Sequence, residues 1–267
     1  MSRIAKTFAR LGDERRAGFV PFLMAGDPGL DVTRELLRAA IDAGADLIEL
    51  GVPFSDPMAD GPVLQRSAER ALALGTTLTQ VLELVAELRR DSQVPIVLFG
   101  YANPLLRYGA ERFARDAATS GVDGVLCVDM PPEEADDLEP ALAAAGLDMI
   151  FLLAPTSDRG RIDAVRARAR GFVYYVSITG TTGAGAPDPA AVAAMVGDVR
   201  SRVGLPVGVG FGITGPEQAA TLARAADAVI VGSAVMRLVE EHPGPGFLPA
   251  ARAFLGDLAA AVHAARG

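Results

Sequence analysis

Short runs of apolar residues recur along the chain, and each is followed by a loop rich in glycine, proline and aspartate. The runs are apolar throughout instead of alternating with polar residues, which is typical of parallel strands covered on both faces. Between the runs, apolar residues recur with helical spacing. The predicted strands are Phe19–Ala25, Asp46–Gly51, Val94–Gly100, Asp123–Asp129, Asp148–Ala154, Phe172–Ser177, Pro206–Gly212 and Asp227–Gly232.

A short phrase is repeated where several predicted helices end. Residues 43–46, 120–123 and 145–148 each contain a glycine followed two positions later by an aspartate. The glycine suits a left-handed helix C-cap, and the aspartate opens the next strand. The phrase marks strand–helix units of roughly 25–35 residues. Eight such units predict a (β/α)8 barrel of about 250 residues; a doubly wound sheet is the alternative, which the lack of a composition break disfavours.

Two helices are predicted in more detail. Ile4, Phe8 and Leu11 recur at helical spacing, which predicts a short amphipathic helix before the first strand. Asp31 is predicted to cap a helix over residues 31–43. We therefore expect an α/β fold with one domain over residues 1–267, a TIM barrel with an extra short N-terminal helix.

The composition argues against several classes of protein. The 267 residues carry a formal net charge of −8, which argues against a nucleic-acid-binding protein. A single cysteine forms no internal disulfide, which fits a reducing compartment. No run reaches the roughly 18 apolar residues of a membrane span. We expect a cytoplasmic protein with no membrane or nucleic-acid partner.

Scarce lysine and histidine exclude several chemistries. Lys6 is the only lysine, so none lies near a predicted strand end to form a Schiff base. His242 and His263 both lie near the C-terminus, which leaves no histidine cluster for a metal and no Ser-His-Asp triad on the barrel. Acid–base chemistry must therefore come from carboxyl groups or tyrosines, and no metal site is predicted.

Glu49 lies inside an apolar strand, near its C-terminal end. Active sites of TIM barrels lie at that end, and a buried carboxyl group there has a raised pKa. We interpret Glu49 as a proton-transfer group. The alternative is a structural carboxylate bound by backbone amides or by an arginine.

Asp60 follows Glu49 in a loop that contains three prolines, which restrict the backbone. It could face the same site as Glu49. The alternative is that Asp60 caps a helix predicted over residues 63–74, and Asp56 could equally be a turn residue.

Glycine-rich segments follow the last three predicted strands, at 180–185, 210–212 and 232–233. Glycine lets backbone N–H groups approach a ligand, and the segments after strands seven and eight form the usual phosphate site of a TIM barrel. The other residues at the strand ends are apolar or aromatic, and together they could line a slot for a flat ring. They are Phe22, Phe99, Tyr101, Leu126, Leu152, Tyr174 and Phe211.

Four segments resemble the α subunits of tryptophan synthase. They are Pro21–Pro28, Tyr101–Pro104, Gly210–Ile213 and, most specifically, Glu49–Pro62, which reads ELGVPFSDPMADGP. Their spacing extends the resemblance over essentially the whole chain. The family is a (β/α)8 barrel that cleaves indole-3-glycerol phosphate to indole and glyceraldehyde 3-phosphate, the last stage of tryptophan biosynthesis.

The resemblance assigns roles to individual residues. Glu49 and Asp60 match the two catalytic carboxylates, and Pro53 and Asp56 match the loop that contacts a β subunit in an αββα complex. The substrate-binding residues it implies are Phe22, Tyr101, Tyr174, Thr182, Gly183, Gly212, Gly232 and Ser233. The chain departs from the family at Ile178, where the loop often carries an arginine. Pyridoxal phosphate is expected only in the partner β subunit, and no cofactor is expected in this chain.

Three other functions remain open at this point. A stand-alone lyase of the same fold would release free indole without a β subunit. A phosphate-binding barrel isomerase of amino-acid biosynthesis would share the glycine loops but would not need the segment Pro53–Pro62. A catalytically silent barrel could act as a structural or regulatory partner, although the presence of both carboxylates argues against it.

Overall fold

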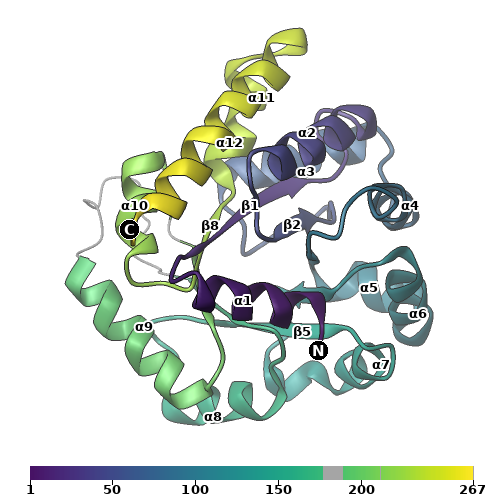
Figure 1. The fold of residues 1–267 in the computed structure, drawn as a ribbon. Coiled ribbons are helices and arrows are strands. Elements are labelled where there is room, and N and C mark those ends of the chain that lie inside the picture. The colour runs from purple at the N-terminus through teal and green to yellow at the C-terminus, as the bar shows by residue number, and fades with distance from the viewer. Residues whose placement is uncertain (177–188, 211, 267) are drawn as a thin grey trace.

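Eight parallel strands close into a barrel in the computed structural model, which describes residues 1–176, 189–210 and 212–266 (Figure 1). Each strand pairs with the next, and β8 pairs with β1, so the predicted closed barrel is confirmed and the doubly wound sheet is wrong. The strands are β1 (Gly18–Met24), β2 (Ile48–Gly51), β3 (Ile96–Gly100), β4 (Gly124–Cys127), β5 (Asp148–Leu153), β6 (Val173–Val176), β7 (Val207–Gly210) and β8 (Ala228–Val231).

Helices surround the barrel and cover the outer face of the strands (Figure 1). Their apolar faces and the outward side chains of the strands form the larger hydrophobic cluster. The α-helices are α1 (Arg3–Asp13), α2 (Leu30–Asp42), α3 (Pro62–Ala73), α4 (Leu78–Leu88), α5 (Ala102–Tyr108), α6 (Ala110–Ser120), α7 (Glu139–Ala144), α8 (Arg159–Arg168), α9 (Pro189–Val203), α10 (Pro216–Ala223), α11 (Ser233–Glu241) and α12 (Phe247–Ala264), with short 3-10 helices η1 (Pro132–Asp137) and η2 (Gly244–Gly246).

The predicted helix cap at Asp31 is wrong, and so is the alternative of a cap at Asp60. Helix α2 begins one residue early, with Gly29 as its N-cap, so that Asp31 lies in its first turn. Helix α3 has Gly61 as its N-cap with no side-chain cap, and Pro62 occupies the first helical position, where proline is favoured. The interpretation of Asp60 as a helix cap is therefore excluded.

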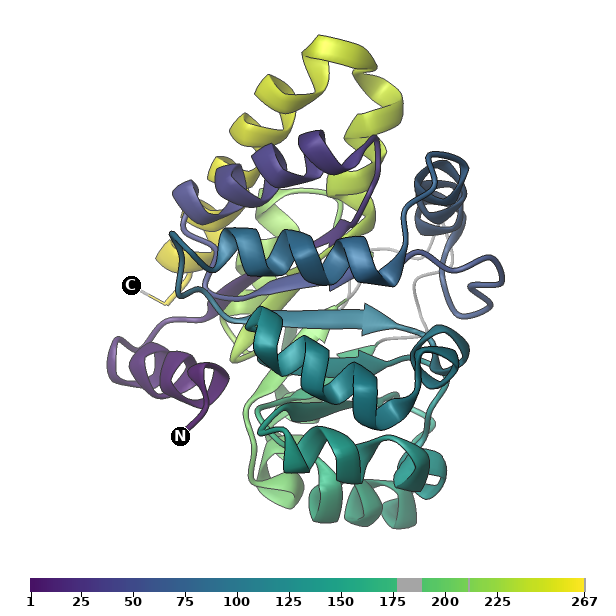
Figure 2. The same ribbon diagram turned by 90° about the vertical axis from the view of Figure 1, so that its right-hand side faces the viewer.

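The predicted N-terminal helix α1 closes the bottom of the barrel, at the end opposite the strand arrowheads (Figure 2). Ile4, Phe8 and Leu11 are buried in a second hydrophobic cluster with inward-facing residues of the strands. This end of the barrel is therefore filled by packed side chains, and polar chemistry is left to the other end.

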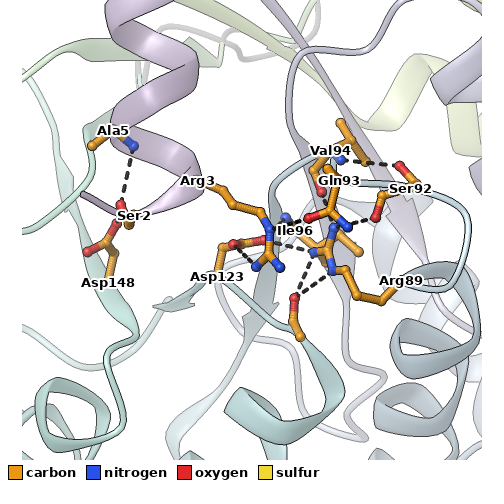
Figure 3. Close-up of polar contacts among 11 residues, drawn as sticks. Ser2, Arg3, Ala5, Arg89, Ser92, Gln93, Val94, Ile96, Asp123 and Asp148 are labelled. Atoms are coloured by element: carbon orange, nitrogen blue, oxygen red, sulfur yellow. Dashed lines mark hydrogen bonds and ion pairs between the residues drawn. The ribbon is translucent and has the colours of Figure 1, made fainter.

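The aspartates of the repeated phrase anchor α1 and its surroundings. Asp123 accepts hydrogen bonds from Arg3, at 3.0 Å, and from Arg89, at 2.9 Å, while Asp148 accepts one from the Ser2 hydroxyl at 2.6 Å (Figure 3). The predicted strands start too early at Asp46 and Asp123, which lie just before β2 and β4, and their carboxylates bind arginine side chains at this end of the barrel.

Among the described residues, no single helix is long and apolar enough to cross a membrane, although α3 and α4, bent by 95° at their junction, together meet the length and composition criteria.

Candidate active site

A cavity of about 670 Å³ opens at the C-terminal ends of the strands. Residues from both halves of the barrel line it, so it lies over the barrel axis as TIM-barrel sites do. Of the site residues predicted from the sequence, it brings together Phe22, Glu49, Asp60, Tyr174, Gly212, Gly232 and Ser233.

Glu49 is fully buried on β2 and pairs in register with Phe22 of β1. Neither carboxyl oxygen of Glu49 has a hydrogen-bond partner among the described residues. No described backbone amide or arginine therefore binds Glu49, as the alternative of a structural carboxylate would require. Burial raises the pKa of Glu49 to about 8, because the charged form loses its hydration without compensation. At neutral pH the group is therefore protonated and able to donate a proton.

Asp60 lies in the segment between β2 and α3, partly buried at the edge of the cavity. Its backbone makes two hydrogen bonds: its N–H donates to the Pro57 carbonyl at 3.0 Å, and its carbonyl accepts from the Gln65 side chain at 2.9 Å. Burial raises the pKa of Asp60 to about 6, and a hydrogen bond from Tyr101 partly opposes the shift. At neutral pH Asp60 is mainly ionised, so one site holds a protonated and an ionised carboxyl group.

Tyr101 lies behind this segment and is not among the residues that line the cavity. Its hydroxyl oxygen accepts a hydrogen bond from the Ala59 N–H at 3.2 Å, and its ring is 5.4 Å from that of Phe54. Pro53 is buried, whereas Asp56 is exposed on the outer side of the same segment. Tyr101 thus supports the segment that carries Asp60, and its contact with substrate stays a prediction.

The side of the cavity next to Glu49 is apolar and aromatic. The Phe22 ring contacts the Phe99 ring edge to face, with centroids 5.1 Å apart. Tyr174 faces the cavity from β6, and a Cβ added at Gly210 of β7 would collide with its hydroxyl. Burial raises the pKa of Tyr174 well above its ordinary value, and the carboxyl groups of Glu49 and Asp60 raise it further. The tyrosine is therefore neutral at physiological pH, and its side chain adds to the aromatic part of the cavity wall.

Glycines after β7 and β8 form another part of the cavity wall. Gly212 has a φ of +26°, and Gly232 is the N-cap of α11 with no side-chain cap. A Cβ at Gly232 would lie 3.2 Å from Phe22, so glycine allows the start of α11 to approach the cavity closely. Unpaired N–H groups at such a helix start favour an anion. Thr182, Gly183, Ile178 and Phe211, named from the sequence, lie outside the described residues.

Polar residues after β5 also line the cavity and were not predicted from the sequence. They are Thr156, Ser157, Asp158 and Arg161. Asp158 caps α8 by accepting from the Arg161 N–H at 2.8 Å, and the Arg161 side chain pairs with Glu133 at 2.9 Å. Their position after a barrel strand could have indicated that they lie at the site. A Ser-Asp pair before a helix is equally typical of a helix cap, however, so the sequence alone did not point to the cavity.

Among the described residues, no group of three or more histidine, cysteine, aspartate or glutamate side chains could hold a metal ion.

The chain is similar to known proteins over nearly its whole length. A family model described as "Tryptophan synthase alpha chain" matches residues 8–248. A tryptophan synthase alpha chain from Geobacter sulfurreducens is 56% identical over 240 residues, which cover 90% of this chain and 91% of that one. One from Leptothrix cholodnii is 51% identical over 268 residues, covering 100% and 99%. The crystal structure of tryptophan synthase subunit alpha from Legionella pneumophila superposes with a TM-score of 0.91 at 39% identity, covering 98% of each chain.

Proposed function

The chain belongs to the tryptophan synthase alpha chain family, whose members are carbon–carbon lyases that cleave indole-3-glycerol phosphate, and we propose that Glu49 and Asp60 carry this reaction here. The observation that carries the proposal is the buried, unpaired Glu49 carboxyl group in one cavity with Asp60 and the start of α11. Indole and glyceraldehyde 3-phosphate are the products. The comparisons favour neither the isomerase nor the silent barrel.

We place the substrate with its indole ring between Phe22 and Tyr174 and its phosphate at Gly212, Gly232 and Ser233. The aromatic side of the cavity matches the ring, and the helix start supplies N–H donors to the phosphate. This orientation sets C3 of the indole beside Glu49 and leaves the indole N–H toward Asp60.

The proposed reaction needs only these two carboxyl groups. Glu49 donates its proton to C3 of the indole, which leaves a positive charge shared with the ring nitrogen. The bond between C3 and the side chain then breaks, and its electron pair returns to the ring. The neighbouring hydroxyl becomes the aldehyde and returns its proton to Glu49, so the acid is regenerated. Asp60 accepts a hydrogen bond from the indole N–H and stabilises the charge that develops there.

The indole itself therefore acts as the electron sink, the role that a Schiff base plays in many aldolases. Lys6, the one lysine, is exposed on α1 at the other end of the barrel. For the same reason the chain offers no lysine for pyridoxal phosphate, and we place that cofactor in a partner β subunit. We also propose that the enzyme works in the cytoplasm.

We propose that the segment with Pro53 and Asp56 forms the contact with the β subunit, in an αββα complex. Asp56 is exposed on this segment, and the apolar side chain of Met58, two residues later, is 90% exposed. A partner that binds there would order the segment that carries Asp60, so partner binding would affect the position of the catalytic carboxylate.

Indole release with and without a β subunit tests this proposal. We expect the purified chain to cleave indole-3-glycerol phosphate slowly on its own and at least tenfold faster with a β subunit, because the contact orders the segment with Asp60. Asp56→Lys should reduce the activation without changing the slow rate, and Asp31→Lys, at an exposed position on α2, should leave both unchanged. A rate that is already high alone, with no activation, would instead identify a stand-alone lyase.

A further inference from the structure

Helices α3 and α11 and the segment between β1 and α2 meet at one arginine. Arg70 of α3 binds Asp27, in the segment between β1 and α2, with two nitrogens: Nε lies 2.8 Å from Oδ1 and Nη2 lies 2.6 Å from Oδ2. Asp27 is fully buried and also accepts a hydrogen bond from the Ser67 hydroxyl. The carboxylate is thus held by α3 through side chains one helical turn apart.

The third nitrogen of the same guanidinium reaches α11. Arg70 Nη1 lies 2.9 Å from Glu240 Oε1, and Arg66 binds both oxygens of Glu240 at 2.8 Å. The hydrogen bonds from Arg66 and Arg70 hold the pKa of Glu240 down at about 2, so Glu240 is ionised throughout the neutral range. Helix α3 packs against both β1 and α11, so the ion pairs join elements that are already in contact.

Both helices begin at the proposed site. Helix α3 starts at Pro62, two residues after Asp60, and α11 starts at Ser233. At a rise of about 1.5 Å per residue, Arg70 lies about 12 Å along α3 and Glu240 about 10 Å along α11 from these starts. Neither Arg70 nor Glu240 is among the residues that line the cavity. Any effect of this pair on a ligand must therefore pass through the position of the helices.

We propose that Arg70 and Glu240 are positioning residues that fix the start of α11 relative to Asp27 and α3, and so set the affinity for the phosphate end of the substrate. The inference rests on the proposed function, because it takes the start of α11 as the phosphate site. A guanidinium suits this role, since its planar fork binds Asp27 at two atoms and still presents a third donor in a fixed direction. The ion pair with Asp27 holds α3 in place, and the ion pair with Glu240 holds α11 against α3.

The test separates the two ends of the substrate. We expect Glu240→Gln to weaken binding of glycerol 3-phosphate about 2- to 30-fold, the usual range for coupling through a packed network. Binding of indole, which carries no phosphate, should stay within about twofold, because Glu240→Gln leaves the pair between Arg70 and Asp27 in place. Arg70→Lys should weaken glycerol 3-phosphate in the same direction, since an ammonium group cannot hold both partners with the same geometry.

A matched control distinguishes positioning from general stability. Glu139 pairs with Arg168 on the other side of the barrel at 3.2 Å, and its side chain is 22% exposed, close to the 30% of Glu240. We expect Glu139→Gln to leave the affinity for glycerol 3-phosphate unchanged, whatever its effect on the melting temperature, whereas Glu240→Gln should lower that affinity. Calorimetric titration of the full chain gives both affinities, and thermal unfolding gives the stability of each variant.

A further variant tells the failure of this inference from the failure of the proposed site. Ser233→Asp puts a carboxylate where the phosphate should bind and should abolish glycerol 3-phosphate binding. If it does, and both Glu240→Gln and Arg70→Lys bind glycerol 3-phosphate like the unaltered chain, the positioning role is wrong and the phosphate site stands. If Ser233→Asp binds normally, the phosphate site is wrong and the positioning role falls with it.

Discussion

Replacing Glu49 with glutamine should lower kcat for cleavage of indole-3-glycerol phosphate by about 10²–10⁴-fold, the usual contribution of a general acid–base group. Glutamine has nearly the same shape but no proton to donate to C3 of the indole. Because burial keeps Glu49 protonated at neutral pH, the substitution replaces one neutral group with another, and we expect the fold to tolerate it. The loss should therefore appear in the chemistry and not in the amount of folded protein.

Single-turnover indole release, with the β subunit present, measures this effect. Glu83→Gln, on the exposed face of α4, is the control and should leave kcat unchanged. Glycerol 3-phosphate should bind Glu49→Gln normally, since the carboxyl group is assigned to the ring end of the site. Cleavage by Glu49→Gln within about threefold of the unaltered enzyme would remove Glu49 from the mechanism.

Replacing Asp60 with asparagine should lower kcat by about 10²–10³-fold, the range found when one preorganised electrostatic contact is removed from a transition state. Asparagine can still accept a hydrogen bond from the indole N–H. It cannot neutralise the positive charge that forms there when C3 is protonated. The effect should fall on kcat much more than on the binding of glycerol 3-phosphate, because the charge exists only during the reaction.

Tyr101→Phe distinguishes the effect of the Asp60 charge on kcat from the effect of the position of its segment. It removes the hydroxyl that accepts from the Ala59 N–H and donates to the Asp60 carboxyl group, but it leaves the carboxylate itself, so its effect on kcat should be smaller than that of Asp60→Asn. Equal losses from both substitutions would mean that Asp60 acts mainly through the shape of the segment. A normal kcat for Asp60→Asn would contradict the charge-stabilising role outright.

Much of the fold could be predicted from local patterns. Parallel strands buried on both faces are continuously apolar, and each strand–helix unit carries its own turn residues, so the eight units are visible along the chain. Glu49 stood out for the same reason, as the one carboxyl group in the middle of an apolar strand near its functional end. The boundaries were less accurate at the strand starts, where an aspartate such as Asp46 lies just before the strand and binds side chains beneath the barrel.

Long-range contacts could not be predicted from these patterns. Asp27 and Arg70 are 43 positions apart, and Arg70 and Glu240 are 170 apart, so no local spacing indicates that they meet. An arginine on an exposed helix face is usually a solvated charge, which made Arg70 unremarkable in the sequence. For Tyr101 the sequence indicated only a contact to the ring, which stays a prediction, and the hydrogen bond from the Ala59 N–H to its hydroxyl could not be predicted.

The pH dependence of kcat/KM for indole-3-glycerol phosphate tests most directly the central claim that Glu49 acts as a protonated acid. Below its pKa of about 8 Glu49 carries the proton it must donate, so the rate should be level near neutral pH and fall about tenfold per pH unit on the alkaline side. The rate is also expected to fall below about pH 6, where Asp60 and the substrate phosphate titrate together. The test of Glu49 is therefore the change in rate on the alkaline side. A rate that holds or rises from about pH 7 to pH 10 would mean that the ionised form of Glu49 is the active one, and would contradict the account.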